Sequence, residues 1–120
     1  MAPHQLICFL GLVREARSLG RLGYRRDGRK VSMDTLAELG LSVTDMLDRV
    51  AALEPTQALN LPWENVHPQF SDELTCDFGI YIEEHGIYVK VTIGIADEEP
   101  VGCVISFHRQ ERPFTFPFTK

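Results

Sequence analysis

The first half of the chain has apolar residues at the three- or four-residue spacing of helices. The spacing predicts a helix over residues 4–19, a short helix over residues 33–39, and a third helix that ends near Pro55. Ser42 and Asp45 form a capping-box start for the third helix. The apolar stripe of the first helix consists of Leu6, Ile7, Leu10, Val13 and Ala16.

From residue 75 onward, apolar and polar residues alternate with a period of two. Three such runs predict three strands, joined by a turn at residues 85–86 and a second break at residues 97–100. The sequence therefore predicts an α+β fold, in which N-terminal helices pack on one face of a three-stranded antiparallel sheet. On the third strand, the expected core-facing positions are Val101, Cys103, Ile105 and Phe107.

The length of 120 residues suits one domain with one modest core. We expect residues 1–120 to form a single domain with a helical part, a loop, an antiparallel meander and a tail, at residues 1–55, 56–73, 74–109 and 110–120. The tail contains three phenylalanines, which pack either on the chain's own core or against a partner. These residues are Phe114, Phe116 and Phe118.

The composition is that of an ordinary globular protein. An apolar content of 44% and a charged content of 24% exclude a fibrous or wholly disordered chain. The apolar run at residues 6–13 is too short to cross a bilayer and leads directly into Arg14, so we expect neither a signal peptide nor a membrane segment. Three cysteines without a CxxC pair predict a cytoplasmic protein with no metal site, and no cofactor-binding motif is present.

The charge is distributed unevenly along the chain. The net charge is −5, yet residues 14–30 hold seven basic residues against two acidic ones. The segment is either the solvated face of a helix and its following loop, or an electrostatic footprint for nucleic acid or an acidic partner. In the second case, Arg25, Arg26 and Arg29 are candidate phosphate-binding residues.

The polar face of the predicted sheet gathers side chains that suit chemistry. With the first turn at residues 85–86, Tyr81 opposes Lys90, and the second turn leaves His108 opposite either Tyr88 or Lys90. In both registers one patch contains Tyr81, Tyr88, Lys90, Ser106 and His108.

A phenol, an ammonium group and an imidazole in one patch are suited to metal-independent RNA cleavage. The 2′-hydroxyl must lose a proton, the phosphate needs a cation, and the leaving 5′-oxygen needs a proton. Histidine exchanges protons near neutral pH, and tyrosine can stack on a base. The alternative is an exposed sheet face on which these residues have no catalytic role.

Three segments resemble the MqsR family of bacterial type II toxins, which have a RelE-like ribonuclease fold. They are LAELGLSVTDMLDRVAALEP at residues 36–55, IYVKVTI at residues 87–93 and VISFH at residues 104–108. The resemblance implies an endoribonuclease that cleaves messenger RNA and is inhibited by a cognate antitoxin protein.

The resemblance also assigns roles to individual residues. Tyr88 and Lys90 match the tyrosine and lysine of the family's Y-x-K strand, and His108 follows the SF pair where family members have a catalytic lysine. We therefore expect these three residues to be catalytic. The expected substrate-binding residues are Tyr81, Ser106, Arg109, Arg25, Arg26 and Arg29. The alternative function is a non-catalytic protein-binding module, such as an immunity-type or regulatory protein.

Overall fold

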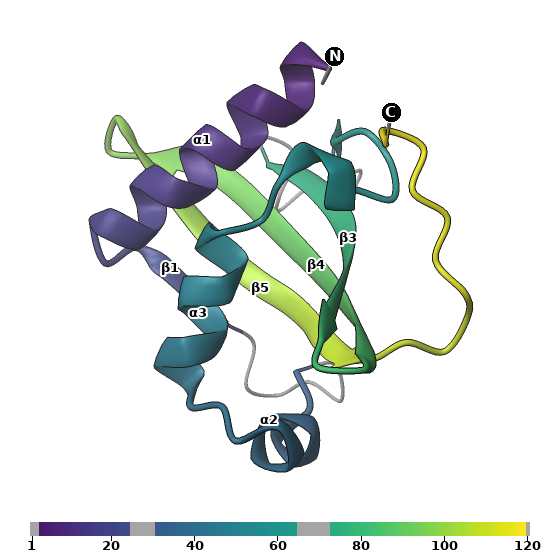
Figure 1. Ribbon diagram of the computed structural model, residues 1–120. Coiled ribbons are helices and arrows are strands. Elements are labelled where there is room, and N and C mark those ends of the chain that lie inside the picture. Colours follow the sequence, from purple (N-terminus) through teal and green to yellow (C-terminus); the bar gives the residue numbers. More distant parts are fainter. Residues whose placement is uncertain (1–2, 25–30, 65–72, 120) are drawn as a thin grey trace.

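The structure, a computed structural model, describes residues 3–24, 31–64 and 73–119. Its elements follow one another as helix, strand, two helices, a short 3-10 turn and four strands (Figure 1). In chain order they are α1 (His4–Ser18), β1 (Leu22–Tyr24), α2 (Met33–Leu39), α3 (Val43–Ala51), η1 (Pro55–Gln57), β2 (Trp63–Glu64), β3 (Leu74–Ile82), β4 (His85–Ala96) and β5 (Glu99–Arg109).

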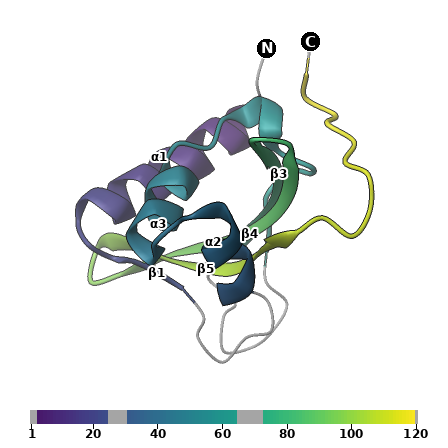
Figure 2. The same ribbon diagram turned by 60° about the horizontal axis from the view of Figure 1, so that its bottom comes forward.

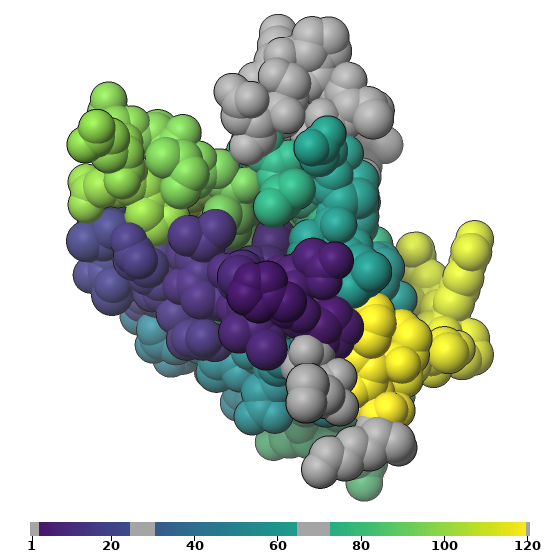
Figure 3. Space-filling view, turned by 90° about the horizontal axis from the view of Figure 1, so that it is seen from above, coloured from purple at the N-terminus to yellow at the C-terminus, as the bar shows by residue number. Residues whose placement is uncertain are grey.

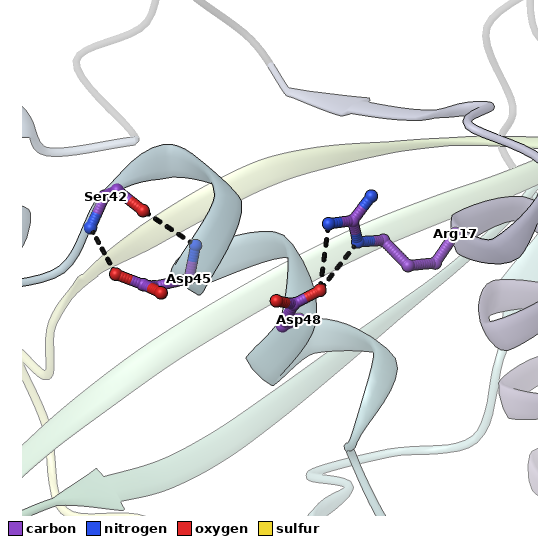
Figure 4. A network of polar contacts seen from close by, with 4 residues as sticks. All are labelled: Arg17, Ser42, Asp45 and Asp48. Carbon is purple, nitrogen blue, oxygen red and sulfur yellow. Dashed lines mark hydrogen bonds and ion pairs between the residues drawn. The ribbon is translucent and has the colours of Figure 1, made fainter.

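The three predicted helices are confirmed, and local sequence explains where two of them start. The hydroxyl of Ser32 accepts a hydrogen bond from the backbone N–H of Thr35 and caps α2. Ser42 and Asp45 form the predicted reciprocal capping box at α3 (Figure 4). The backbone N–H of Ser42 donates to the Asp45 carboxylate, which lowers the pKa of that carboxyl group. Ile7 is an exception to the predicted apolar stripe of α1, because its side chain is 49% exposed.

The predicted three-stranded antiparallel sheet is wrong, although the α+β class is correct. The sheet has five strands in the order β1-β5-β4-β3-β2, and β1 runs parallel to β5. The two additional strands are three and two residues long, too short for an alternating pattern to reveal them. Nevertheless, β1 contributes the buried Leu22 to the core, and β2 presents Trp63 beside β3.

The first hairpin turn lies two residues earlier than predicted. Ile82 pairs with His85, and Glu83 has a φ of 58° in the turn. Gly86 lies within β4, where a Cβ atom would overlap the end of the Gln110 side chain and that side chain would have to move. This glycine therefore lies in contact with Gln110 and outside the turn.

The second hairpin has a two-residue turn, in which Asp97 and Glu98 both adopt positive φ values of 55° and 64°. Such values are characteristic of tight hairpin turns that match the twist of the strands. Ala96 consequently pairs with Glu99.

A β-bulge in β5 changes which of its side chains face the core. Lys90 pairs with Ser106, but the next residue, Val91, pairs with Val104, so Ile105 is an extra residue in β5. Val104 is consequently fully buried, whereas Ile105 is partly exposed. The predicted core positions Val101, Cys103 and Ile105 are wrong for this reason, and Phe107 is correct because it lies beyond the bulge.

The helices α1 and α3 lie together on one face of the sheet (Figures 1 and 2). Phe9 of α1 contacts Phe78 of β3 with ring centroids 6.1 Å apart in the core between these layers. An ion pair of 2.9 Å between Arg17 and Asp48 connects α1 to α3 at the edge of this layer (Figure 4). Within the described parts of the chain, every helix is too short or too polar to cross a membrane.

The bulge leads to a stability prediction. Replacing Val104 with alanine should lower the free energy of unfolding by about 2 kcal/mol, because it removes two buried methyl groups and leaves a cavity. The matched change Ile105→Ala should cost about 1 kcal/mol or less, because that side chain is already partly in water. Urea denaturation of both variants measures the difference. A larger loss for Ile105→Ala would mean that β5 has no bulge.

Candidate functional site

The C-terminal segment 110–119 follows β5 and turns back beside β3 (Figure 1). The backbone N–H of Gln110 donates to the carbonyl oxygen of Gly86, which fixes the start of this segment. Phe114 packs directly on Gly79, where a Cβ atom would lie 2.7 Å from its ring. Because Gly79 alternates with the buried residues of β3, Phe114 lies on the polar face of the sheet.

The end of the tail behaves differently from its start. Phe118 is partly buried and packs against the hydrophobic core. The space-filling view shows this end of the chain beside the start of α1 (Figure 3). The phenylalanines of the tail therefore do not share one location. Phe118 packs against the core, whereas Phe114 lies on the polar face of the sheet.

A pocket of about 540 Å³ lies between the polar sheet face and the tail. Its walls come from three neighbouring parts of the chain and from Leu59 in the segment before β2. The lining residues that bear on chemistry are Tyr88 and Lys90 of β4, Ser106 and His108 of β5, and Glu111, Arg112 and Phe114 of the tail.

The strand register explains why four of these side chains meet. Tyr88 pairs directly with His108, and Lys90 pairs directly with Ser106. The rings of Tyr88 and His108 lie 5.3 Å apart between centroids, with an angle of 36° between their planes. Of the two registers open from the sequence, the structure has His108 opposite Tyr88. Ser106 is almost completely buried beneath the pocket, with 2% of its surface exposed.

The side chain of Tyr88 is held by Asp77, which the sequence did not indicate as part of the site. Its hydroxyl donates to Asp77 Oδ1 at 2.7 Å, and Asn60 Nδ2 donates to Asp77 Oδ2 at 2.9 Å. Burial, followed by the hydrogen bond to Asp77, raises the pKa of the Tyr88 phenol. Tyr88 therefore stays protonated over the range in which most enzymes work. The alternation in β3 places Asp77 on the polar face of the sheet. The predicted turn position pairs Lys90 with Tyr81, whereas in the structure Lys90 pairs with Asp77.

The hydrogen bond of His108 identifies which of its ring nitrogens can accept a proton. Its Nδ1 lies 2.8 Å from the carbonyl oxygen of Arg109. Since a carbonyl oxygen only accepts hydrogen bonds, Nδ1 is the donor, and in the neutral imidazole Nε2 retains a lone pair. This tautomer makes Nε2 the proton acceptor of the ring.

Two cations line the pocket together with the carboxylate of Glu111. The ammonium nitrogen of Lys90 lies 5.7 Å from the ring centroid of Trp63, a cation–π geometry that restricts the lysine without neutralising it. Arg112 is exposed and joins the pocket from the tail. Neither the contact of Lys90 with Trp63 nor the place of Arg112 in the pocket was expected, because a sequence pattern places neither the short strand β2 nor the irregular tail in space.

The remaining predicted site residues lie elsewhere. Tyr81 pairs with Gly86 and contacts Phe114 beside the pocket. Arg109 pairs with Ile87 on the helix-covered side of the sheet and forms a 3.0 Å ion pair with Glu38 of α2. Arg25, Arg26 and Arg29 lie outside the described residues.

Other arginines of the basic segment have structural partners. Arg17 pairs with Asp48, and the guanidinium of Arg21 donates to the carbonyl oxygens of Pro100 and Ala96. Tyr24 and Val31, the described residues that flank positions 25–30, both pair with β5. For Arg17 and Arg21, the structure therefore favours a structural role over binding to nucleic acid.

Comparisons of the chain with protein-family models, with curated protein sequences and with solved structures gave no significant match. The resemblance to the MqsR family stays a prediction from the quoted segments. Among the residues that the structure describes, no three histidine, cysteine or acidic side chains are grouped as metal ligands would be.

The contact between Tyr88 and Asp77 predicts a pH dependence of stability. A raised pKa in the folded state favours the protonated phenol, so this contribution is complete below pH about 10 and is lost as the pH rises above it. Burial also raises the pKa of Cys76, to about 12, with the same sign. Urea denaturation from about pH 8 to about pH 11 should therefore show a steeper loss of stability for wild type than for Tyr88→Phe. Parallel pH profiles would mean that the Tyr88 phenol is not held in the folded protein.

Proposed function

We propose that the chain is a metal-independent endoribonuclease that cleaves messenger RNA, as the toxin component of a type II toxin–antitoxin system. The observation that carries the proposal is the position of His108, which lines one pocket together with Lys90 and Arg112 and whose Nδ1 is engaged by the backbone, so that Nε2 is its proton acceptor. An imidazole beside two cations supplies the proton transfer and the charge stabilisation that phosphodiester cleavage needs. The resemblance of three segments to the MqsR family supports the same reaction.

The roles of the pocket residues follow from their chemistry. Nε2 of His108 takes the proton of the ribose 2′-hydroxyl as its oxygen attacks phosphorus. The bond from phosphorus to the 5′-oxygen breaks, and a 2′,3′-cyclic phosphate forms. Lys90 and Arg112 face the negative charge that develops on the phosphate. Lys90, unlike arginine, can also release a proton to the leaving 5′-oxygen.

Tyr88 has a positioning role in this mechanism. Its proton is engaged by Asp77, and its raised pKa makes it unsuited to act as a base. Its ring contacts the imidazole of His108 from the adjacent strand. Asp77 and Asn60 thereby hold Tyr88, and Tyr88 limits the orientations of His108.

The proposal implies two partners, messenger RNA as the substrate and a cognate antitoxin protein as the inhibitor. A toxin that cleaves cellular RNA has to be inhibited in the cell that makes it. A small gene directly beside this one, whose product relieves the toxicity of the chain, would be the antitoxin.

The first test is induction of wild type and His108→Ala in bacterial cells, followed by growth and by the integrity of messenger RNA. Wild type should arrest growth and fragment messenger RNA, and the variant should do neither, because a lost proton acceptor costs about 10²- to 10⁴-fold in rate. The matched control is His85→Ala, which changes a histidine at the start of β4, outside the pocket.

The purified protein gives a sharper second measurement. Cleavage of single-stranded RNA should leave cyclic-phosphate ends and should persist in the presence of a chelator. Loss of activity with chelator would refute the mechanism. Normal growth and intact RNA with a folded, abundant wild-type chain would instead favour the non-catalytic protein-binding module.

A further inference from the structure

We infer that Tyr81, Phe114 and Phe116 form a stacking subsite for a base of single-stranded RNA, next to the phosphate held in the pocket. These three residues are called the aromatic cluster below. The inference rests on the proposed function for the identity of the ligand. It adds a binding site that the pattern of the sequence does not reveal, because two of its three residues lie in the irregular tail.

The aromatic cluster is continuous. The rings of Tyr81 and Phe114 meet edge-to-face with centroids 5.9 Å apart, and those of Phe114 and Phe116 with centroids 5.7 Å apart. Phe114 is also part of the pocket wall, so the cluster begins where the pocket ends.

The cluster is not part of the hydrophobic core. Tyr81 is 57% exposed, and Phe114 and Phe116 are both partly exposed. Single exposed apolar residues are common on proteins, but three aromatic rings in contact beside a polar pocket form a patch. Phe118 provides the contrast within the same tail, because it packs against the core.

The backbone is shaped to seat this cluster. A Cβ atom at Gly79 would lie 2.7 Å from Phe114, so the ring occupies the space that any other residue would fill. The ring of Phe114 thereby lies against the sheet and in contact with Tyr81.

The spacing along the sheet suits a base adjacent to the reacting phosphate. The pair of Tyr81 and Gly86 lies two residues along β4 from Tyr88, which faces His108. At the rise of a strand, this separation is about 7 Å. An extended strand whose reacting phosphate lies at His108 can therefore place a neighbouring base on the aromatic cluster.

RNA suits this combination of surfaces better than an apolar peptide does. Proteins that bind single strands join cationic groups for the backbone with aromatic side chains for the bases, and every base offers a flat π-face. Lys90 and Arg112 supply the first feature and the aromatic cluster the second. An apolar peptide would bring no anionic group to these two cations.

The experiment measures binding separately from cleavage. The probes are two fluorescent oligonucleotides of equal length with 2′-O-methyl groups, which remove the attacking hydroxyl. One carries a mixed sequence of all four bases, and the other is abasic at its central positions. Fluorescence anisotropy gives the dissociation constants for wild type, Phe114→Leu, Tyr81→Leu and the control Phe118→Leu.

Wild type should bind the oligonucleotide with bases about tenfold more tightly than the abasic one. Phe114→Leu and Tyr81→Leu should each lose most of this preference while retaining affinity for the abasic probe. Phe118→Leu should keep it, because that ring lies outside the cluster. Tyr81 is exposed, so its variant tests the inference even if Phe114→Leu fails to fold.

The outcomes separate this inference from the proposed function. Equal binding of both probes by wild type, or a preference that survives both cluster variants, overturns the stacking subsite even if the protein cleaves RNA. A preference for bases that depends on the cluster supports the subsite even if wild type does not cleave RNA. Failure to bind either probe overturns the subsite.

Discussion

The pairing of β4 with β5, and the bulge within it, is the constraint on which both the core and the candidate site depend. On the C-terminal side of the bulge residue Ile105, the register places Ser106 against Lys90 and His108 against Tyr88. On its N-terminal side, the register turns Val104 into the core. Without the extra residue, one half of β5 would present the wrong face, because a shift of one position exchanges the two sides of a strand.

The tail converts a sheet face into a pocket, and two glycines make this possible. Gly86 and Gly79 lie on the polar face, where Gln110 and Phe114 occupy the space of their absent side chains. The tail can therefore lie close to β3 and β4 and bring Arg112 to the pocket that Lys90 also lines. An exposed sheet would bind a phosphate only weakly from one side. The second wall adds the cation of Arg112 to the site.

Sequence patterns predicted the parts of this molecule that are governed by local rules. The helix spacing and the Ser42 capping box required nothing beyond neighbouring residues, and the helices α1, α2 and α3 are where they were predicted. The strands β1 and β2 are held by pairing with distant residues and carry too few positions for a pattern. The polar patch of Tyr88, Lys90, Ser106 and His108 followed from alternation, but Asp77 and Arg112 depended on a turn and a tail that only tertiary packing defines.

The electrostatics of the chain bear on how an acidic protein would hold RNA. The chain has a net charge of −5, so its long-range electrostatic interaction with a polyanion is at best weakly attractive and at worst repulsive. Of the described arginines, Arg17 and Arg109 are neutralised by carboxylates, and Arg21 serves backbone carbonyls. Among the residues that line the pocket, the cationic side chains are Lys90 and Arg112. A ligand held by so few cations needs a second source of binding energy. Aromatic stacking supplies one, because it is not screened by salt and is not weakened by the negative net charge of the chain.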